Sequence, residues 1–274
     1  MCHLFAISAS EPRTIKPFAE NLAPFATKEN PDGWGLAAIR TTQTTLIKEP
    51  RSFASALDEG GPTVTRALRA NGETLLFHLR DSSVGKNSID NTHPFRRHFL
   101  KRSFVFMHNG TVPDVRKLPL SRLERTGETD SEHAFLWFLE AMPPAPPRNF
   151  SRWLKGESDL VRRLGKFNFV LAEGSTLWAY ADTSLFYAER VEPAEEASRP
   201  ARPARSTHSA SPGSRLQLVR SAAGARASHA PARRSAARVV LVASCPMTQS
   251  DRWTQLAQGS LLVAKHGRVQ EILQ

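Results

Sequence analysis

Short apolar runs bounded by turn residues recur along most of the 274-residue chain. Runs of this length that contain β-branched and aromatic residues are typical of buried strands. They predict strands at Leu4–Ser8, Trp34–Ile39, Thr45–Lys48, Thr74–Leu79, Ser103–Met107, Phe167–Ala172, Thr176–Ala181, Leu185–Glu189, Arg238–Ser244 and Ser260–Ala264.

Three longer segments indicate helices instead, at Thr14–Ala26, Asp130–Met142 and Phe150–Leu164. The second of these follows a Gly-Glu-Thr cluster that can supply an N-cap. Many strands with the helices in blocks predict an α+β fold whose sheets bury one face against helices. The sequence contains no internal repeat.

One segment differs in composition from the rest. From about 191 to 237 the chain is mainly Ala, Arg, Ser and Pro, with almost no aromatic residues. Such a composition cannot bury enough apolar surface to offset the entropy lost on ordering. It predicts a disordered insertion in a single domain spanning 2–274, with one strand-like stretch at Leu216–Arg220.

The net charge of +11 arises from 37 basic and 26 acidic residues, and it raises the question of nucleic-acid binding. The charge is concentrated, because Ala197–Arg238 holds nine arginines and no acidic residue. The insertion is therefore either a solvated loop or a basic arm for an anionic partner. Elsewhere the chain lacks a basic stripe interleaved with aromatic residues, so only non-specific nucleic-acid binding through the arm is expected.

Composition excludes several classes of protein. Apolar residues make up 40% of the chain and charged residues 23%, which is enough for a sizeable core. No apolar run approaches the roughly 18 residues of a membrane span, and the start lacks the basic region of a secretory signal. Two cysteines exclude a disulfide scaffold. We therefore expect a cytoplasmic protein that does not enter a membrane.

Cys2 is the sharpest single candidate for chemistry. Removal of the initiator Met before this small residue would place a thiol and a free α-amine on one residue. An α-amine has a pKa of about 7.7–8.0, so near neutral pH it can accept the proton of the thiol. The alternative is that Cys2, like Cys245, is a small buried residue beside a strand.

Four polar clusters follow predicted strands or precede a predicted helix. They are His78–Gly85, Asn91–Phe95, Met107–Gly110 and Gly127–Glu132. An Arg at a strand end can bind a carboxylate bidentately, an Asn-Gly pair offers two donors to an oxyanion, and an Asp can bind an ammonium group. Each cluster alone is better explained as a turn, a salt bridge or a cap.

Together, and in this order, the clusters resemble the class II glutamine amidotransferases, whose nucleophile is an N-terminal cysteine. The family's motifs correspond to Cys2, Asp32–Gly35, His78–Arg80 (H-x-R), Asn91–Pro94 (N-x-H-P), His108–Gly110 (H-N-G) and Thr129–Glu132. The segment Ala243–Thr248 resembles the close of the small stand-alone branch. That branch includes γ-glutamyl amide hydrolases of ergothioneine synthesis and of glutathione degradation.

The resemblance implies a four-layer αββα sandwich of the N-terminal-nucleophile hydrolase type. It also implies cleavage of the γ-amide of glutamine or of a γ-glutamyl compound, with release of glutamate and of ammonia or an amine. Cys2 would form a thioester, and Asn109 and Gly110 would form the oxyanion hole. The sequence does not identify a partner that would accept the ammonia.

Substrate-binding roles are implied by the same resemblance. Arg80, with Ser83 nearby, would bind the substrate α-carboxylate, and Asp130 would bind the α-ammonium group. Asp81 stands where synthase members of the family usually have Trp, so the edge of the pocket is expected to differ.

Other interpretations of the sequence have less support. The nine histidines form no H-E-x-x-H motif and no Cys-x-x-Cys occurs, so no metal site is predicted. The S-x-x-K match at Ser83–Lys86 lacks the further motifs of β-lactamases. Nucleotide-binding fingerprints are absent, so no cofactor is implied. The alternative from another class is a binding or regulatory protein that uses the basic arm on nucleic acid or another anionic partner.

Overall fold

The computed structural model describes residues 2–26, 32–41, 43–81, 85–144, 149–192 and 236–274. Ser83, the strand predicted at Leu216–Arg220 and residues 193–235 of the predicted insertion lie outside the described residues. In chain order the elements are β1 (His3–Thr14), α1 (Lys16–Leu22), η1 (Ala23–Ala26), β2 (Gly33–Arg40), β3 (Gln43–Glu49), α2 (Phe53–Glu59), α3 (Pro62–Arg69), β4 (Asn71–Arg80), β5 (Phe95–Phe99), β6 (Arg102–Thr111), η2 (Pro113–Lys117), α4 (Asp130–Ala141), α5 (Phe150–Val161), η3 (Arg162–Leu164), β7 (Lys166–Glu173), β8 (Thr176–Ala181), β9 (Phe186–Glu192), β10 (Ala237–Ala243), β11 (Thr254–Gln255), β12 (Ser260–Lys265) and β13 (Arg268–Leu273).

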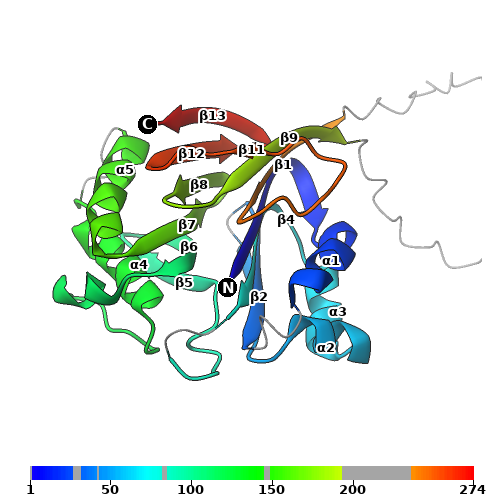
Figure 1. The fold of residues 1–274 in the computed structure, drawn as a ribbon, viewed down its shortest axis with the longest axis horizontal. Helices are drawn as coiled ribbons and strands as arrows, with labels where there is room; N and C mark the ends of the chain where they lie inside the picture. The colour runs from blue at the N-terminus through cyan, green and yellow to red at the C-terminus, as the bar shows by residue number, and fades with distance from the viewer. Residues whose placement is uncertain (1, 27–31, 42, 82–84, 145–148, 193–235) are drawn as a thin grey trace, which may run out of the picture.

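The described strands form two antiparallel sheets that face each other (Figure 1). One sheet has the order β11-β9-β10-β1-β4-β2-β3, and the other has the order β13-β12-β8-β7-β6-β5. Helices α1, α2 and α3 cover the outer face of the first sheet, and α4 and α5 cover that of the second (Figure 1). These are the four layers that the resemblance implies.

Alternation of side chains along each strand assigns residues to the layers. In β1, Phe5 and Ile7 pack toward α1, whereas Leu4 and Ala6 point into the core between the sheets. Both faces of the central strands are therefore apolar. Because neither face meets water, these strands are near-continuous hydrophobic runs in the sequence.

The ten strands predicted outside the insertion are confirmed, and the predicted helices agree at α4 and α5. Thr129 caps α4 by accepting a hydrogen bond from the Glu132 N–H at 3.1 Å. The helix predicted at Thr14–Ala26 is wrong at its start, because Thr14 ends β1 and pairs with Asn71. The helix begins only where Pro17 can occupy its first turn. None of the described helices is long and apolar enough to cross a membrane.

The ends of the insertion lie side by side. Glu192, the last residue of β9, pairs with Ala237, the first residue of β10. The predicted boundaries at 191 and 237 therefore cut into two paired strands, and the chain leaves the sheet only after Glu192. The strands that flank the segment are therefore neighbours in one sheet.

Three buried histidines, His78, His93 and His108, lie near one end of the sandwich. The His78 Nε2–H donates to the His108 carbonyl across the two sheets at 3.1 Å, and the ring of His93 lies 4.3 Å from that of His78. Among the described residues, neither ring nitrogen of His93 has a hydrogen-bond partner. Burial lowers the pKa of His78 to about 3 and lowers the pKa of both His93 and His108. All three are therefore neutral in the folded protein near pH 7.

This burial predicts acid sensitivity. Because the folded-state pKa values lie below the usual value of about 6.5, the unfolded chain binds protons first as the pH falls. The stability that comes from these neutral histidines is complete above about pH 6.5 and declines below it, by about 1 kcal/mol for His78 at pH 5.5. Urea unfolding at pH 7.5 and 5.5 measures this loss. His93→Phe should reduce it, whereas His98→Phe, at an exposed position of β5, should not. An unchanged loss in His93→Phe contradicts the assignment.

Candidate active site

Four polar residues continue the inner face of their strands at one end of the sandwich. Cys2 precedes Leu4 and Ala6 of β1, which point between the sheets, and Arg80 ends β4 on the same face as Leu76. Asn109 follows Val105 and Met107 in β6, and Ser244 follows Val240 and Val242 in β10. Side chains in a strand point to the same face every second residue. These four polar side chains therefore lie on the faces that the core residues turn toward the space between the sheets.

The Cys2 thiol lies against the backbone of Asp81. Its Sγ atom is 3.2 Å from both the N–H and the carbonyl oxygen of that residue, so it can accept from one and donate to the other. Burial raises the pKa of the Cys2 thiol above its usual range, and the Asp81 N–H and the Arg80 charge only partly oppose this rise. The resting thiol is therefore protonated at neutral pH, and a reaction through the thiolate needs a base.

Arg80 is buried at the end of β4, and its guanidinium is oriented by neutral acceptors. It donates to Asn87 Oδ1 at 2.8 Å, to the Gly85 carbonyl at 3.2 Å and to the Asp32 carbonyl at 3.4 Å. Burial lowers the pKa of the guanidinium, and the Asp32 carboxylate and Cys2 oppose this effect. Asn87 in turn donates to Asp32 Oδ1 at 2.9 Å, which joins the loop before β2 to the loop after β4.

Asn109 and Gly110 lie near the end of β6. The Asn109 side-chain amide donates to Ser244 Oγ at 3.3 Å, and Ser244 Oγ also accepts the Leu4 N–H at 2.9 Å. A Cβ atom at Gly110 would lie 2.0 Å from the Lys166 carbonyl oxygen, and the φ of +153° disfavours any L side chain. Asn109 is thus linked through Ser244 to Leu4, two positions after Cys2, and position 110 accommodates only glycine.

Asp130 is the first residue of α4, and its carboxylate faces the end of β6. Its Oδ2 accepts the Val112 N–H at 2.7 Å, and its Oδ1 accepts the Ser131 N–H at 2.9 Å. The positive end of the helix dipole also favours a carboxylate at this position. The structure thereby places Asp130 beside the strand that carries Asn109.

Asn91 connects the loop that holds Arg80 to the loop that precedes Asp130. Its side-chain amide donates to the Lys86 carbonyl at 3.0 Å, and its Oδ1 accepts the Glu128 N–H at 2.7 Å. The loop that follows Arg80 and the loop that precedes Asp130 are therefore joined through Asn91. Ser83, the third predicted substrate-binding residue, lies outside the described residues.

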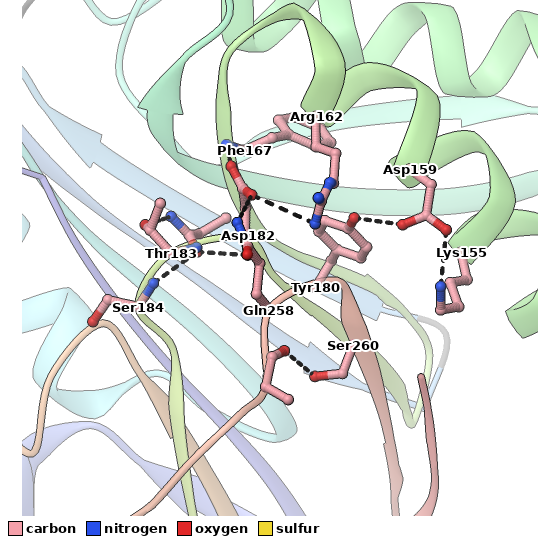
Figure 2. A network of polar contacts seen from close by, with 12 residues as sticks. Lys155, Asp159, Arg162, Phe167, Tyr180, Asp182, Thr183, Ser184, Gln258 and Ser260 are labelled. Atoms are coloured by element: carbon pink, nitrogen blue, oxygen red, sulfur yellow. Dashed lines mark hydrogen bonds and ion pairs between the residues drawn. The ribbon is translucent and has the colours of Figure 1, made fainter.

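Sequence reasoning assigned no role to Ser244 or Asn168. The Asn168 amide donates to the Asn109 carbonyl at 3.2 Å, and its Oδ1 accepts the N–H groups of Asp182, Thr183 and Ser184. Figure 2 shows this turn, in which the Asp182 carboxylate also accepts the Phe167 N–H. Of the two, only Ser244 lay in a motif that the sequence singled out. Within the described ranges, no cluster of three His, Cys, Asp or Glu side chains could hold a metal ion.

Comparison with known proteins assigns this arrangement to a family. Residues 1–199 match the family model of the class-II glutamine amidotransferases. The chain belongs to this family. It is 29% identical over 202 residues to YafJ of Escherichia coli, which covers 70% of this chain and 78% of YafJ. The family resemblance drawn from the motifs is confirmed.

Solved structures confirm the fold. A protein of Pseudomonas aeruginosa PA01, described as a predicted glutamine amidotransferase, has a TM-score of 0.66 at 23% identity over 98% of this chain and 99% of its own. Glutamine phosphoribosylpyrophosphate amidotransferase from B. subtilis has a TM-score of 0.60 at 11% identity, over 98% of this chain and 48% of its own. The two sheets and their helices are those of a class II amidotransferase domain of the N-terminal-nucleophile type.

The close packing at Gly110 predicts a large effect of a single methyl group. Gly110→Ala should lower the free energy of unfolding by about 2–4 kcal/mol, because the new Cβ would collide with the Lys166 carbonyl and force β6 from β7. Gly156→Ala is the matched control, since nothing lies within 4 Å of its Cβ in α5. It should stabilise the protein by up to about 1 kcal/mol. Equal urea midpoints for the two variants would contradict the packing argument.

Proposed function

We propose that the protein hydrolyses the γ-amide of glutamine or of another γ-glutamyl compound, with Cys2 as the nucleophile. The observation that carries the proposal is the position of the Cys2 thiol. It lies at the end of β4 beside Arg80, and Ser244 links the adjoining strand segment to the Asn109 amide. A nucleophile, a cation and an oriented amide donor thus share one end of the inter-sheet layer.

The reaction begins with proton transfer from the thiol. After removal of Met1, the α-amine of Cys2 takes the thiol proton, which matters because burial raises the pKa of this thiol. The thiolate attacks the γ-carboxamide carbon, and the carbonyl π electrons move to oxygen. The Asn109 side-chain amide and the Gly110 N–H stabilise the resulting oxyanion.

Collapse of this intermediate breaks the C–N bond. The leaving amine takes the proton from the α-ammonium of Cys2, and a thioester remains. A water molecule gives a proton to the α-amine and attacks the thioester carbon through a second oxyanion. Glutamate is released, and the thiol regains its proton.

Charge recognition would select the amino-acid end of the substrate. Arg80 binds the α-carboxylate, with Ser83 nearby, and Asp130 binds the α-ammonium group. The burial of both charged groups supports this assignment, because an opposite charge on the substrate would offset part of the cost of burying each one. The substrate class is then glutamine or another γ-glutamyl amide, which includes the amides cleaved in ergothioneine synthesis and glutathione degradation. Thiol chemistry of this kind suits the reducing cytoplasm.

The first prediction of this mechanism concerns Met1. The active protein should begin at Cys2, because an amide-linked Met1 would remove the basic α-amine. Mass spectrometry should find the chain shorter by one Met, and Cys2→Ala should have no measurable amidase activity. Cys245→Ser, which changes the other thiol, should retain activity. Activity in a protein that still carries Met1 would contradict the mechanism.

The second prediction separates binding from chemistry. Charge appears on the amide oxygen only during attack, so Asn109→Ala should lower kcat by about 10²–10³ with little change in KM. The substrate ammonium is charged throughout, so Asp130→Asn should chiefly raise KM, by about tenfold to a hundredfold. Steady-state kinetics on glutamine measures both. Full kcat in Asn109→Ala, or equally fast cleavage of acyl amides without the amino-acid end, would refute the assignments.

A further inference from the structure

Four residues from separate segments form a closed circuit of hydrogen bonds around Asn109. The Asn109 amide donates to Ser244 Oγ at 3.3 Å, and the Ser244 carbonyl accepts the Ser184 hydroxyl at 2.9 Å. The Ser184 N–H donates to Asn168 Oδ1 at 3.3 Å, and the Asn168 amide donates to the Asn109 carbonyl at 3.2 Å. The circuit therefore returns to the residue from which it starts.

Ser244 is the member of the circuit that contacts the strand of the nucleophile. Its Oγ accepts the Leu4 N–H at 2.9 Å, and its own N–H donates to the Leu4 carbonyl at 3.1 Å. Both the hydroxyl and the backbone of Ser244 are thus fixed to β1, two residues after Cys2. Ser244 is 7% exposed, so water has little access to compete for these bonds.

The opposite side of the circuit is supported by a polar network in the second sheet. Figure 2 shows the turn of Asp182, Thr183 and Ser184, with Gln258 donating to the Asp182 carboxylate. Asn168 accepts three consecutive backbone N–H groups from this turn. The turn that presents the Ser184 hydroxyl to Ser244 is therefore itself fixed.

We infer that Ser244 is a positioning residue that sets the direction of the Asn109 amide. The Asn109 Nδ2 atom carries two hydrogens, and Ser244 Oγ accepts one of them. The direction of the remaining hydrogen is then determined by the strand pairing of β1 with β10. An oxyanion hole acts through donors that are oriented before the reaction, so an amide without this support stabilises the oxyanion less. This inference rests on the proposed function, and Ser244 lies outside the residues matched by the family model.

Kinetics on glutamine test the inference with a matched control. Ser244→Ala should lower kcat by about tenfold to a hundredfold and leave KM within about twofold. Ser244→Thr, which keeps the oxygen, should retain most of kcat. Ser8→Ala is the control, because Ser8 is another buried serine of the same sheet and its hydroxyl accepts the Gly267 N–H at 3.2 Å. This variant should lower the stability of the protein without lowering kcat. Equal kcat losses in the Ser8 and Ser244 alanine variants, or in the Thr and Ala variants of Ser244, overturn the inference.

A double variant shows whether Ser244 acts through Asn109. In an Asn109→Ala background, Ser244→Ala should cause no further loss of kcat, because the amide that it orients is gone. The rate at which iodoacetamide alkylates Cys2 should stay within about twofold in Ser244→Ala, since this reaction needs no oxyanion hole. Losses that multiply, or a large fall in alkylation, overturn the inference.

A crystal structure of Ser244→Ala separates this inference from the proposed function. If the wild-type protein cleaves no γ-glutamyl amide, the proposed function fails and the structure alone decides the inference. A turned or doubly oriented Asn109 amide in the variant supports it. An Asn109 amide that keeps its wild-type direction overturns it, whether or not the wild-type protein is active.

Discussion

The antiparallel pairing of β1 with β4 and β10 is the constraint from which the geometry of the site follows. His3 pairs with Leu79, and Phe5 pairs with Ala243. This register brings Cys2 beside the end of β4 and Ser244 beside Leu4. Because side chains alternate with a period of two, a slip of one residue would turn Leu4 and Ala6 out of the inter-sheet core. The apolar core therefore enforces the register, and the register places the polar groups.

The same layered burial limits which groups can carry charge. The buried histidines His78, His93 and His108 are neutral, because burial lowers their pKa values. Arg80 lies at the edge of that space, where carbonyl and amide oxygens solvate it. Asp130 has two N–H donors at a helix start. The charges of Arg80 and Asp130 thus lie at positions where dipoles of the protein replace water.

Sequence patterns predict the elements whose signal is local. The buried strands, α4 with its Thr129 cap and the motifs that contain Arg80, Asn109 and Asp130 are all visible along the chain. Helices α2 and α3 were missed, although Gly60 ends one with a φ of +62° and Pro62 opens the other. Contacts between distant strands carry no local signal. Ser244 contacts Leu4 and Asn109 across 240 and 135 positions of sequence, so only the sheet order could reveal its place.

Sheet order also separates the basic insertion from the chemistry. The insertion leaves and re-enters the sheet at Glu192 and Ala237, which pair at one end of β10, while Ser244 follows the other end. A seven-residue strand spans about 20 Å, which is twice the Debye length of about 10 Å at 0.1 M salt. The charge at the points where the insertion joins the sheet is therefore screened from Cys2 and Asn109. The nine arginines of Ala197–Arg238 account for most of the net charge of the chain, and the hydrogen bonds that join Ser244 to Leu4 and Asn109 lie at the opposite end of the strand.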